Sequence, residues 1–244
     1  MSFYSKFSEY YERVFPFREE VWRFLKEYAG SPGNALLDVG CGPGHYCGRF
    51  ASEGFSALGI DLDKAMIAEA QHHYPDAEFR CLDMRRVDEV GRQFDCIWSI
   101  GNVMAHLPGD ELALFLSKIY ALLKPGGYWI MQVMNWNALA GLTDYDFPVR
   151  TIEANGSKAT FHRRYSSITP ESLQFTFSLR NEASVLLEKS LKLYPVGMDR
   201  YRTLHEEAGF RCEGIFSDFS GTPVKNVTGT GLVLVFGKGA HRPH

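Results

Sequence analysis

An apolar run that leads directly into closely spaced glycines constrains this chain more than any other feature. The run covers residues 36–39, and Gly40, Gly42 and Gly44 follow it at alternate positions. Glycine has no Cβ atom, so its backbone can turn tightly and a ligand can lie directly against it. In open α/β sheets, such a turn at the carboxyl end of the first parallel strand is where nucleotide-like cofactors bind. The pattern therefore predicts an α/β fold with a cofactor site at this turn.

Short apolar runs alternate with amphipathic stretches of helical length over residues 34–133, which is typical of βαβ units around a parallel sheet. We expect a Rossmann-like, seven-stranded, mostly parallel sheet with helices on both faces. The expected strands cover residues 35–39, 56–60, 77–82, 94–100, 127–134, 210–216 and 232–236. The expected helices cover residues 44–53, 64–74, 110–123 and 199–208.

The hydrophobic periodicity changes from helical to alternating over residues 146–194. Phe175, Phe177 and Leu179 alternate with polar neighbours, and Asn155-Gly156 stands between two such runs, which is a strong hairpin signal. We interpret this part as an inserted antiparallel β extension that forms either a roof over the substrate or a contact with a second copy of the chain. The expected domains are an N-terminal helical cap over 1–30, a cofactor-binding domain over 31–135 and 196–238, and the β insertion over 136–195.

Composition excludes several classes of partner. The formal net charge is −3 and no run of basic residues is present, so we expect no nucleic-acid partner. The sequence shows neither a secretory signal nor an apolar stretch of about 18 residues, so we expect no membrane partner and a cytoplasmic location. The five cysteines form no Cys-x-x-Cys pair, which predicts free thiols and no metal site. The expected partner is a small-molecule substrate, and the chain is a monomer or a homodimer.

Acidic residues stand at the ends of three successive expected strands. Asp38 would brace the glycine turn. Asp61 follows Gly40 by about 20 residues, the spacing of a carboxylate that accepts both ribose hydroxyls of a bound nucleotide. Asp83 ends the third strand. The alternative for Asp61 and Asp83 is that each caps the helix that follows it.

Five segments, in this order, resemble the motifs of the class I S-adenosylmethionine-dependent methyltransferases. They are residues 36–44, Gly59-Ile60-Asp61, Cys81-Leu82-Asp83-Met84, residues 94–100 and residues 122–127. The resemblance implies S-adenosylmethionine as the cofactor and methyl transfer as the reaction. It also implies an architecture similar to enzymes that act on small molecules, including glycine N-methyltransferase and the amino-sugar N-methyltransferases.

The resemblance assigns roles to particular residues. Asp61 would bind the ribose and Asp83 the adenine amino group, while Leu62 and Met84 would lie on the two sides of the adenine, with the thioether as a polarizable partner. An aromatic N-terminal helix folds over the cofactor in many such enzymes; the alternative is that these aromatic side chains cover a face of the sheet. The implied cofactor-binding residues are Asp38, Gly40, Cys41, Gly42, Asp61, Leu62, Asp83, Met84, Ile100, Tyr4 and Tyr10.

The substrate side carries fewer signals. His106, just past the fourth expected strand, is the candidate catalytic residue, because a hydroxyl acceptor needs a general base. The alternative is that it only precedes the helix that begins near Asp110. We interpret His162-Arg163-Arg164 as the solvated face of a strand, with anion binding as the alternative. The candidate substrate-binding residues are Tyr11, Asn102 and Tyr194. The histidines expected on the surface or in loops are His45, His72, His73 and His205.

These observations favour methyl transfer to a nitrogen or oxygen nucleophile of a small molecule, by in-line displacement. Two alternatives stay open. A nicotinamide-dependent oxidoreductase is disfavoured, because its third glycine would fall where His45 stands. A cofactor-binding protein without catalysis is the other, because no residue outside the cofactor segments compels a catalytic role.

Overall fold

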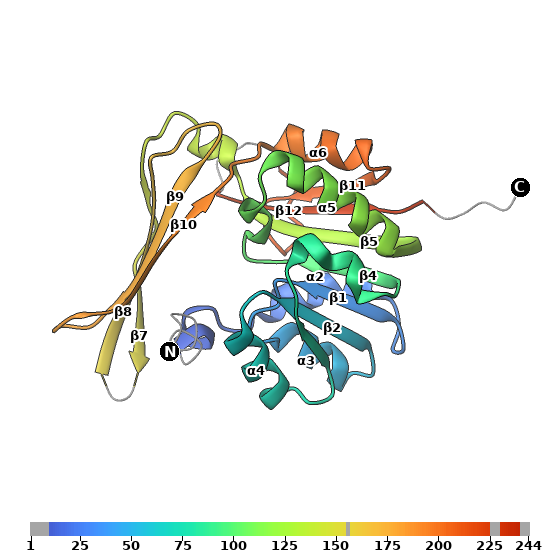
Figure 1. Cartoon of the computed structure of the whole chain (residues 1–244), viewed down its shortest axis with the longest axis horizontal. Coiled ribbons are helices and arrows are strands. Elements are labelled where there is room, and N and C mark those ends of the chain that lie inside the picture. The colour runs from blue at the N-terminus through green and yellow to red at the C-terminus, as the bar shows by residue number, and fades with distance from the viewer. Residues whose placement is uncertain (1–9, 155–156, 225–229, 240–244) are drawn as a thin grey trace, which may run out of the picture.

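The computed structural model describes residues 10–154, 157–224 and 230–239, and it shows two sheets side by side (Figure 1). The larger sheet has seven strands in the order β11-β12-β5-β4-β1-β2-β3. Strands β1 to β5 are all parallel to one another, while β12 is antiparallel to both β5 and β11. The strands are β1 Ala35–Val39, β2 Ser56–Asp61, β3 Glu78–Cys81, β4 Phe94–Ser99, β5 Leu123–Met134, β11 Arg211–Phe216 and β12 Gly231–Gly237. The expected fold class is confirmed.

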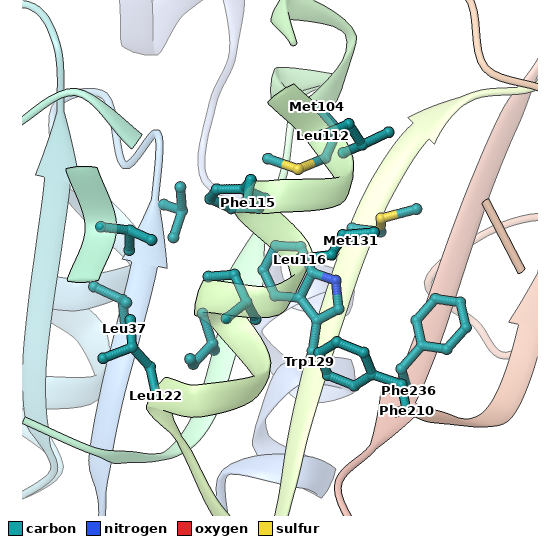
Figure 2. Close-up of a cluster of buried hydrophobic side chains, with 14 of the residues drawn as sticks. Leu37, Met104, Leu112, Phe115, Leu116, Leu122, Trp129, Met131, Phe210 and Phe236 are labelled. Carbon is teal, nitrogen blue, oxygen red and sulfur yellow. The ribbon is translucent and has the colours of Figure 1, made fainter. Parts of the chain in front are cut away.

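Helices cover both faces of this sheet. They are α2 Glu19–Ala29, α3 His45–Ser52, α4 Lys64–His73, α5 Gly109–Leu122 and α6 Met198–Glu207, with short 3-10 turns η1 Met84–Val90, η2 Val103–His106 and η3 Trp136–Leu139. Successive strand residues point to opposite faces, so Leu36 belongs to the core cluster that contains α2 and α3, while Leu37 belongs to the cluster that contains α5 and α6. Figure 2 shows Phe115 and Leu116 of α5 packed on this second face beside Trp129 and Met131 of β5. No helix within the described residues is long and apolar enough to cross a membrane.

The smaller sheet is antiparallel, with the order β10-β9-β8-β6 and β7 paired to β8. Its strands are β6 Tyr145–Asp146, β7 Arg150–Ala154, β8 Ser157–Ser166, β9 Leu173–Arg180 and β10 Val185–Leu193. Strands β7 and β8 pair as the expected hairpin, although its turn, Asn155-Gly156, lies outside the described residues. Phe177 and Leu179 are buried, as their alternation predicts.

The N-terminal segment divides between the two sheets. Trp22 and Phe24 of α2 are buried on one face of the larger sheet, as expected of side chains that cover a sheet. The helical turn at residues 10–14 packs instead on the smaller sheet, where Val14 and Phe15 join the cluster that contains Phe161. This turn therefore lies between the smaller sheet and α4, whose Met66 belongs to the same cluster (Figure 1).

The expectation that His205 lies on the surface is wrong. Its side chain is fully buried in α6, stacked on Phe236 with ring centroids 3.7 Å apart. The Trp129 Nε1–H group donates to His205 Nε2 at 3.0 Å, so the ring carries its proton on Nδ1 and donates to the Tyr201 carbonyl at 2.6 Å. Burial lowers the pKa of His205 to about 3. The neutral ring thus satisfies both of its nitrogens inside the core.

This histidine should make the stability of the protein depend on pH. Because the pKa is low in the folded state and about 6.5 in the unfolded chain, the unfolded chain binds more protons between these values, and the free energy of unfolding rises with pH there. The contribution is complete above about pH 6.5 and falls by about 1.4 kcal/mol per pH unit below it. The His205→Gln variant, which keeps an acceptor for Trp129, should lose this dependence. Urea unfolding at pH 7.5 and 5.5 would measure the free energy of unfolding at each pH. The same difference between the two pH values in the wild type and the variant would contradict the prediction.

Candidate active site

A cavity of about 1110 Å³ lies between the carboxyl edge of the larger sheet and the inner face of the smaller one. The ends of β1, β2 and β4 contribute Gly40, Asp61 and Ile100 to one wall, and the smaller sheet contributes aromatic side chains such as Phe161 and Phe177 to the other. Ligand pockets usually measure about 300–1,000 Å³, so this cavity has room for a cofactor and a second small molecule.

The glycine loop forms the floor of the cavity. Gly40, Gly42 and Gly44 all have positive φ angles, of 79°, 54° and 82°. A Cβ atom on Gly40 would lie 2.7 Å from the Val103 side chain, and one on Gly44 would lie 2.5 Å from Phe79. Both conformation and packing therefore require glycine at positions 40 and 44, and Gly40 and Gly42 line the cavity.

Asp61 connects the ends of two strands. Its Oδ2 atom accepts a hydrogen bond from the Gly42 amide and its Oδ1 atom one from the Asp63 amide, both at 2.9 Å. Burial raises the pKa of Asp61. The alternative interpretation as a helix cap is wrong, because Asp63 caps α4 by accepting from the Ala65 and Met66 amides. Asp61 is thus held in the cavity wall and not at the helix terminus.

Asp83 does cap the turn that follows it. Its Oδ1 atom accepts from the Arg85 amide at 2.9 Å, and both carboxylate oxygens accept from the Arg85 guanidinium. This pairing lowers the pKa of Asp83. Asp83 also lines the cavity, together with Leu62 and Met84. Leu62 is 69 % exposed.

Asp38 and Tyr11 are buried beside the glycine loop. Asp38 is 3 % exposed, and burial, with a smaller effect of Asp61, raises its pKa to about 7 while Trp98 opposes the shift. Burial and the nearby Asp61 also raise the pKa of Tyr11. The Tyr11 hydroxyl lies above Gly42, so the N-terminal turn covers the loop.

The loop after β4 connects both sheets. Asn102, whose φ angle is 63°, accepts from the Met134 amide at 2.9 Å and donates to the Tyr165 hydroxyl at 3.4 Å. His106, at the end of η2, lines the cavity. Burial and the nearby Lys189 lower its pKa, so the ring is neutral at pH 7 and can accept a proton.

The cavity brings together most of the residues singled out from the sequence, whose individual roles stay predictions. Tyr10 and Tyr194 are not among the described residues that line it, and Tyr4 lies outside the described residues. Tyr10 packs against the cluster around Phe161, and the Tyr194 amide donates to the Ala105 carbonyl at 2.8 Å. The lining residues among those expected are Asp38, Gly40, Cys41, Gly42, Asp61, Leu62, Asp83, Met84, Ile100, Tyr11, Asn102 and His106.

Several lining residues were missed. His45 was expected on the surface, but it lines the cavity, and burial lowers its pKa to about 4. The solvated-face interpretation holds for Arg164, which pairs with Asp144 and Asp146, but it is wrong for Arg163, which lines the cavity. Successive residues of β8 point to opposite faces of the sheet, so Arg163 and Arg164 lie on different faces. Other missed lining residues are Arg18, Tyr46, Arg150 and Lys189. The described ranges contain no group of three or more His, Cys, Asp or Glu side chains arranged for a metal ion.

The sheet order, the glycine loop and the acids at successive strand ends are similar to those of class I S-adenosylmethionine-dependent methyltransferases. Residues 36–127 match the model of a family described as a methyltransferase domain.

The chain is similar to several known methyltransferases, and it spans less than two thirds of the length of the first relative described here. The ubiquinone biosynthesis O-methyltransferase of Nitrobacter winogradskyi is 30 % identical over 176 residues, which cover 69 % of this chain and 63 % of that relative. A methyltransferase of Clostridium acetobutylicum superposes with a TM-score of 0.79 at 15 % identity, covering 97 % of this chain and 99 % of the other. An amino pentose methyltransferase of Micromonospora echinaspora, solved with its cofactor, gives 0.69 at 20 % identity, covering 89 % and 88 %. At these identities the two structures establish the fold alone.

Proposed function

We propose that the protein transfers the methyl group of S-adenosylmethionine to a nitrogen or oxygen nucleophile of a small molecule, by in-line displacement. The observation that carries the proposal is the cavity that has the glycine loop and Asp61 on one wall and the smaller sheet on the other. The named activities of an O-methyltransferase relative and an amino pentose methyltransferase neighbour support this range of acceptors.

The residues present fit the cofactor. The Asp61 carboxylate accepts one amide on each oxygen and keeps further lone pairs for ribose hydroxyls. The apolar Leu62 and Met84 side chains border the place where an adenine would lie, and the glycine backbone leaves room beside it. When bound, the cofactor supplies a methyl group that its sulfonium already activates.

The chain itself has three tasks. The cavity walls orient the acceptor in line with the methyl–sulfur bond, an effect worth up to about 7–11 kcal/mol in well-aligned systems. The smaller sheet and the turn at residues 10–14 exclude water. The neutral His106 ring accepts the proton of a hydroxyl acceptor, whereas a neutral amine needs no such base.

The proposal assigns the smaller sheet, within residues 136–195, to the substrate and not to the adenosine. Phe177→Ala should therefore change turnover or substrate range while cofactor affinity stays within about 1 kcal/mol. Thr176→Ala is the matched control, because Thr176 bonds to Ser190 and is not among the described lining residues. Production of S-adenosylhomocysteine, screened over amine and hydroxyl metabolites, measures turnover. Calorimetry with S-adenosylmethionine, S-adenosylhomocysteine and NAD measures binding, and a response to NAD alone would overturn the proposal.

We also propose that the protein works in the cytoplasm as a monomer or homodimer. All five cysteines, Cys41, Cys47, Cys81, Cys96 and Cys212, are free thiols, which supports a reducing compartment.

A further inference from the structure

The inner face of the smaller sheet carries cations among its aromatic side chains. Arg163 of β8 is in register with Phe177 of β9, and Phe177 is in register with Lys189 of β10. All three line the cavity, and we call them the cationic row. Adjacent strands lie about 4.8 Å apart, so the row spans about 10 Å with a phenyl ring between two positive charges. Arg150 of β7 lines the cavity beside it.

Arg163 has no carboxylate partner among the described residues, whereas the adjacent Arg164 pairs with Asp144 and Asp146. Its guanidinium lies 4.6 Å from the centre of the Phe147 ring and 5.8 Å from that of Phe161. Its Nε atom is buried and has no hydrogen-bond partner, and no carboxylate within the described residues forms an ion pair with it. Burial and the charge of Arg150 lower the pKa of Arg163, so its surroundings disfavour the cation. A half-buried cation with an unbonded Nε–H group has lost part of its solvation, and an incoming anion would compensate for that loss.

The opposite wall of the cavity carries several carboxylates. Asp38, Asp61 and Asp63 line the side formed by the strand ends of the larger sheet, where Asp83 also lies but is paired with Arg85. An anionic molecule in this cavity is therefore repelled from the strand ends and attracted to the smaller sheet. Arg18, which precedes α2 and pairs with Glu20, is a separate cation in the cavity wall, close to Tyr46 of α3. A cofactor carboxylate can thus be neutralised without Arg163.

We propose that the methyl acceptor is an anionic ring compound, whose carboxylate or phosphate group pairs with Arg163 and whose ring packs on Phe177 and its aromatic neighbours. The fork of a guanidinium matches the two oxygens of either acid group, and the flanking aromatic faces accept an apolar ring. This inference rests on the proposed function, because that function places the methyl donor on the strand-end wall and leaves the cationic row to the acceptor.

Binding of matched acidic and neutral compounds tests the inference without requiring turnover. The probes are 4-hydroxybenzoate against 4-hydroxybenzamide, and benzyl phosphate against benzyl alcohol, each measured by calorimetry with and without S-adenosylhomocysteine. We expect the wild-type protein to bind at least one acid about tenfold or more tightly than its neutral partner. A preference for 4-hydroxybenzoate would identify a carboxylate as the acid group, and a preference for benzyl phosphate would identify a phosphate.

Two variants of neighbouring residues locate the effect. Arg163→Met should abolish the preference for the acid and melt at or above the wild-type temperature, because it removes an unpaired cation. Arg164→Met, one residue along the same strand and paired with Asp144 and Asp146, should keep the preference. Lys189→Met should reduce it as a second, independent change in the row.

The outcomes separate the two proposals. Equal binding of acid and neutral compound in both arms, or an unchanged preference in Arg163→Met, would overturn the anionic acceptor even if S-adenosylhomocysteine binds. A preference that depends on Arg163 in a protein that does not bind S-adenosylhomocysteine would support the anion site and overturn methyl transfer.

Discussion

Cofactor binding is expected to weaken by about 5- to 150-fold when Asp61 is replaced with alanine, equivalent to about 1–3 kcal/mol. The variant loses the carboxylate that we propose as the acceptor for the two ribose hydroxyls. It also loses the acceptor for the Gly42 amide, so the glycine loop is no longer tied to the end of β2. Calorimetry with S-adenosylmethionine and S-adenosylhomocysteine measures the change.

Two further variants make this result interpretable. Asp88→Ala removes a carboxylate that pairs with Lys118 on the surface and should bind the cofactor as the wild type does. Asp61→Asn keeps the shape of the side chain but presents an amide N–H group to one of two backbone donors, so it should also bind weakly while it remains folded. Normal affinity in a folded Asp61 variant would show that the ribose is bound elsewhere.

A larger effect is expected on turnover when His106 is replaced with glutamine. With a hydroxyl acceptor, kcat should fall by about 10²–10⁴-fold, because the variant cannot take up the proton, while cofactor affinity stays unchanged. The pKa of His106 is lowered by burial and by Lys189, so wild-type activity should rise with pH below about 6.5 and be level at pH 7. In the variant, activity should no longer rise with pH below about 6.5, a part of the profile that we call the acidic limb.

His72→Gln, on an exposed histidine of α4, is the control and should leave both kcat and the pH profile unchanged. Rates for the three proteins, measured with one hydroxyl acceptor from pH 5 to 8, compare them directly. A His106 variant with wild-type kcat and an unchanged acidic limb would exclude this histidine as the base.

The larger sheet could be predicted because its signals are local. The apolar run at 35–39 and the glycines after it specify a strand and a turn within a few residues, and β1 begins and ends where expected. The placement of the acids at positions 38, 61 and 83 at one edge of the sheet could also be predicted, because the carboxyl ends of parallel strands meet there. Which nearby acid caps the helix that follows was visible only in the structure, where Asp63 and not Asp61 caps α4.

The remaining site residues depend on tertiary packing. Adjacent strand residues point in opposite directions, so the roles of Arg163 and Arg164 depend on which face of β8 meets the larger sheet, and the His162-Arg163-Arg164 segment does not encode that. His205 belongs to a helix whose inner face is fixed by contact with Trp129 and Phe236 from distant strands. Tyr194 was expected at the substrate, but its backbone fastens the exit of the smaller sheet to Ala105.

The hydrogen bonds of the loop after β4 have a consequence for how such an enzyme diversifies. Asn102 joins Met134 of the larger sheet to Tyr165 of the smaller one, and Ala105 holds Tyr194, so both attachments lie within a few residues of His106. A change in the length or tilt of the smaller sheet would therefore reposition the proposed base together with the acceptor surface. The glycine loop and Asp61 have no such attachment to the smaller sheet among the contacts of the described residues. Acceptor choice and base geometry can evolve as one unit while the cofactor half of the enzyme stays constant.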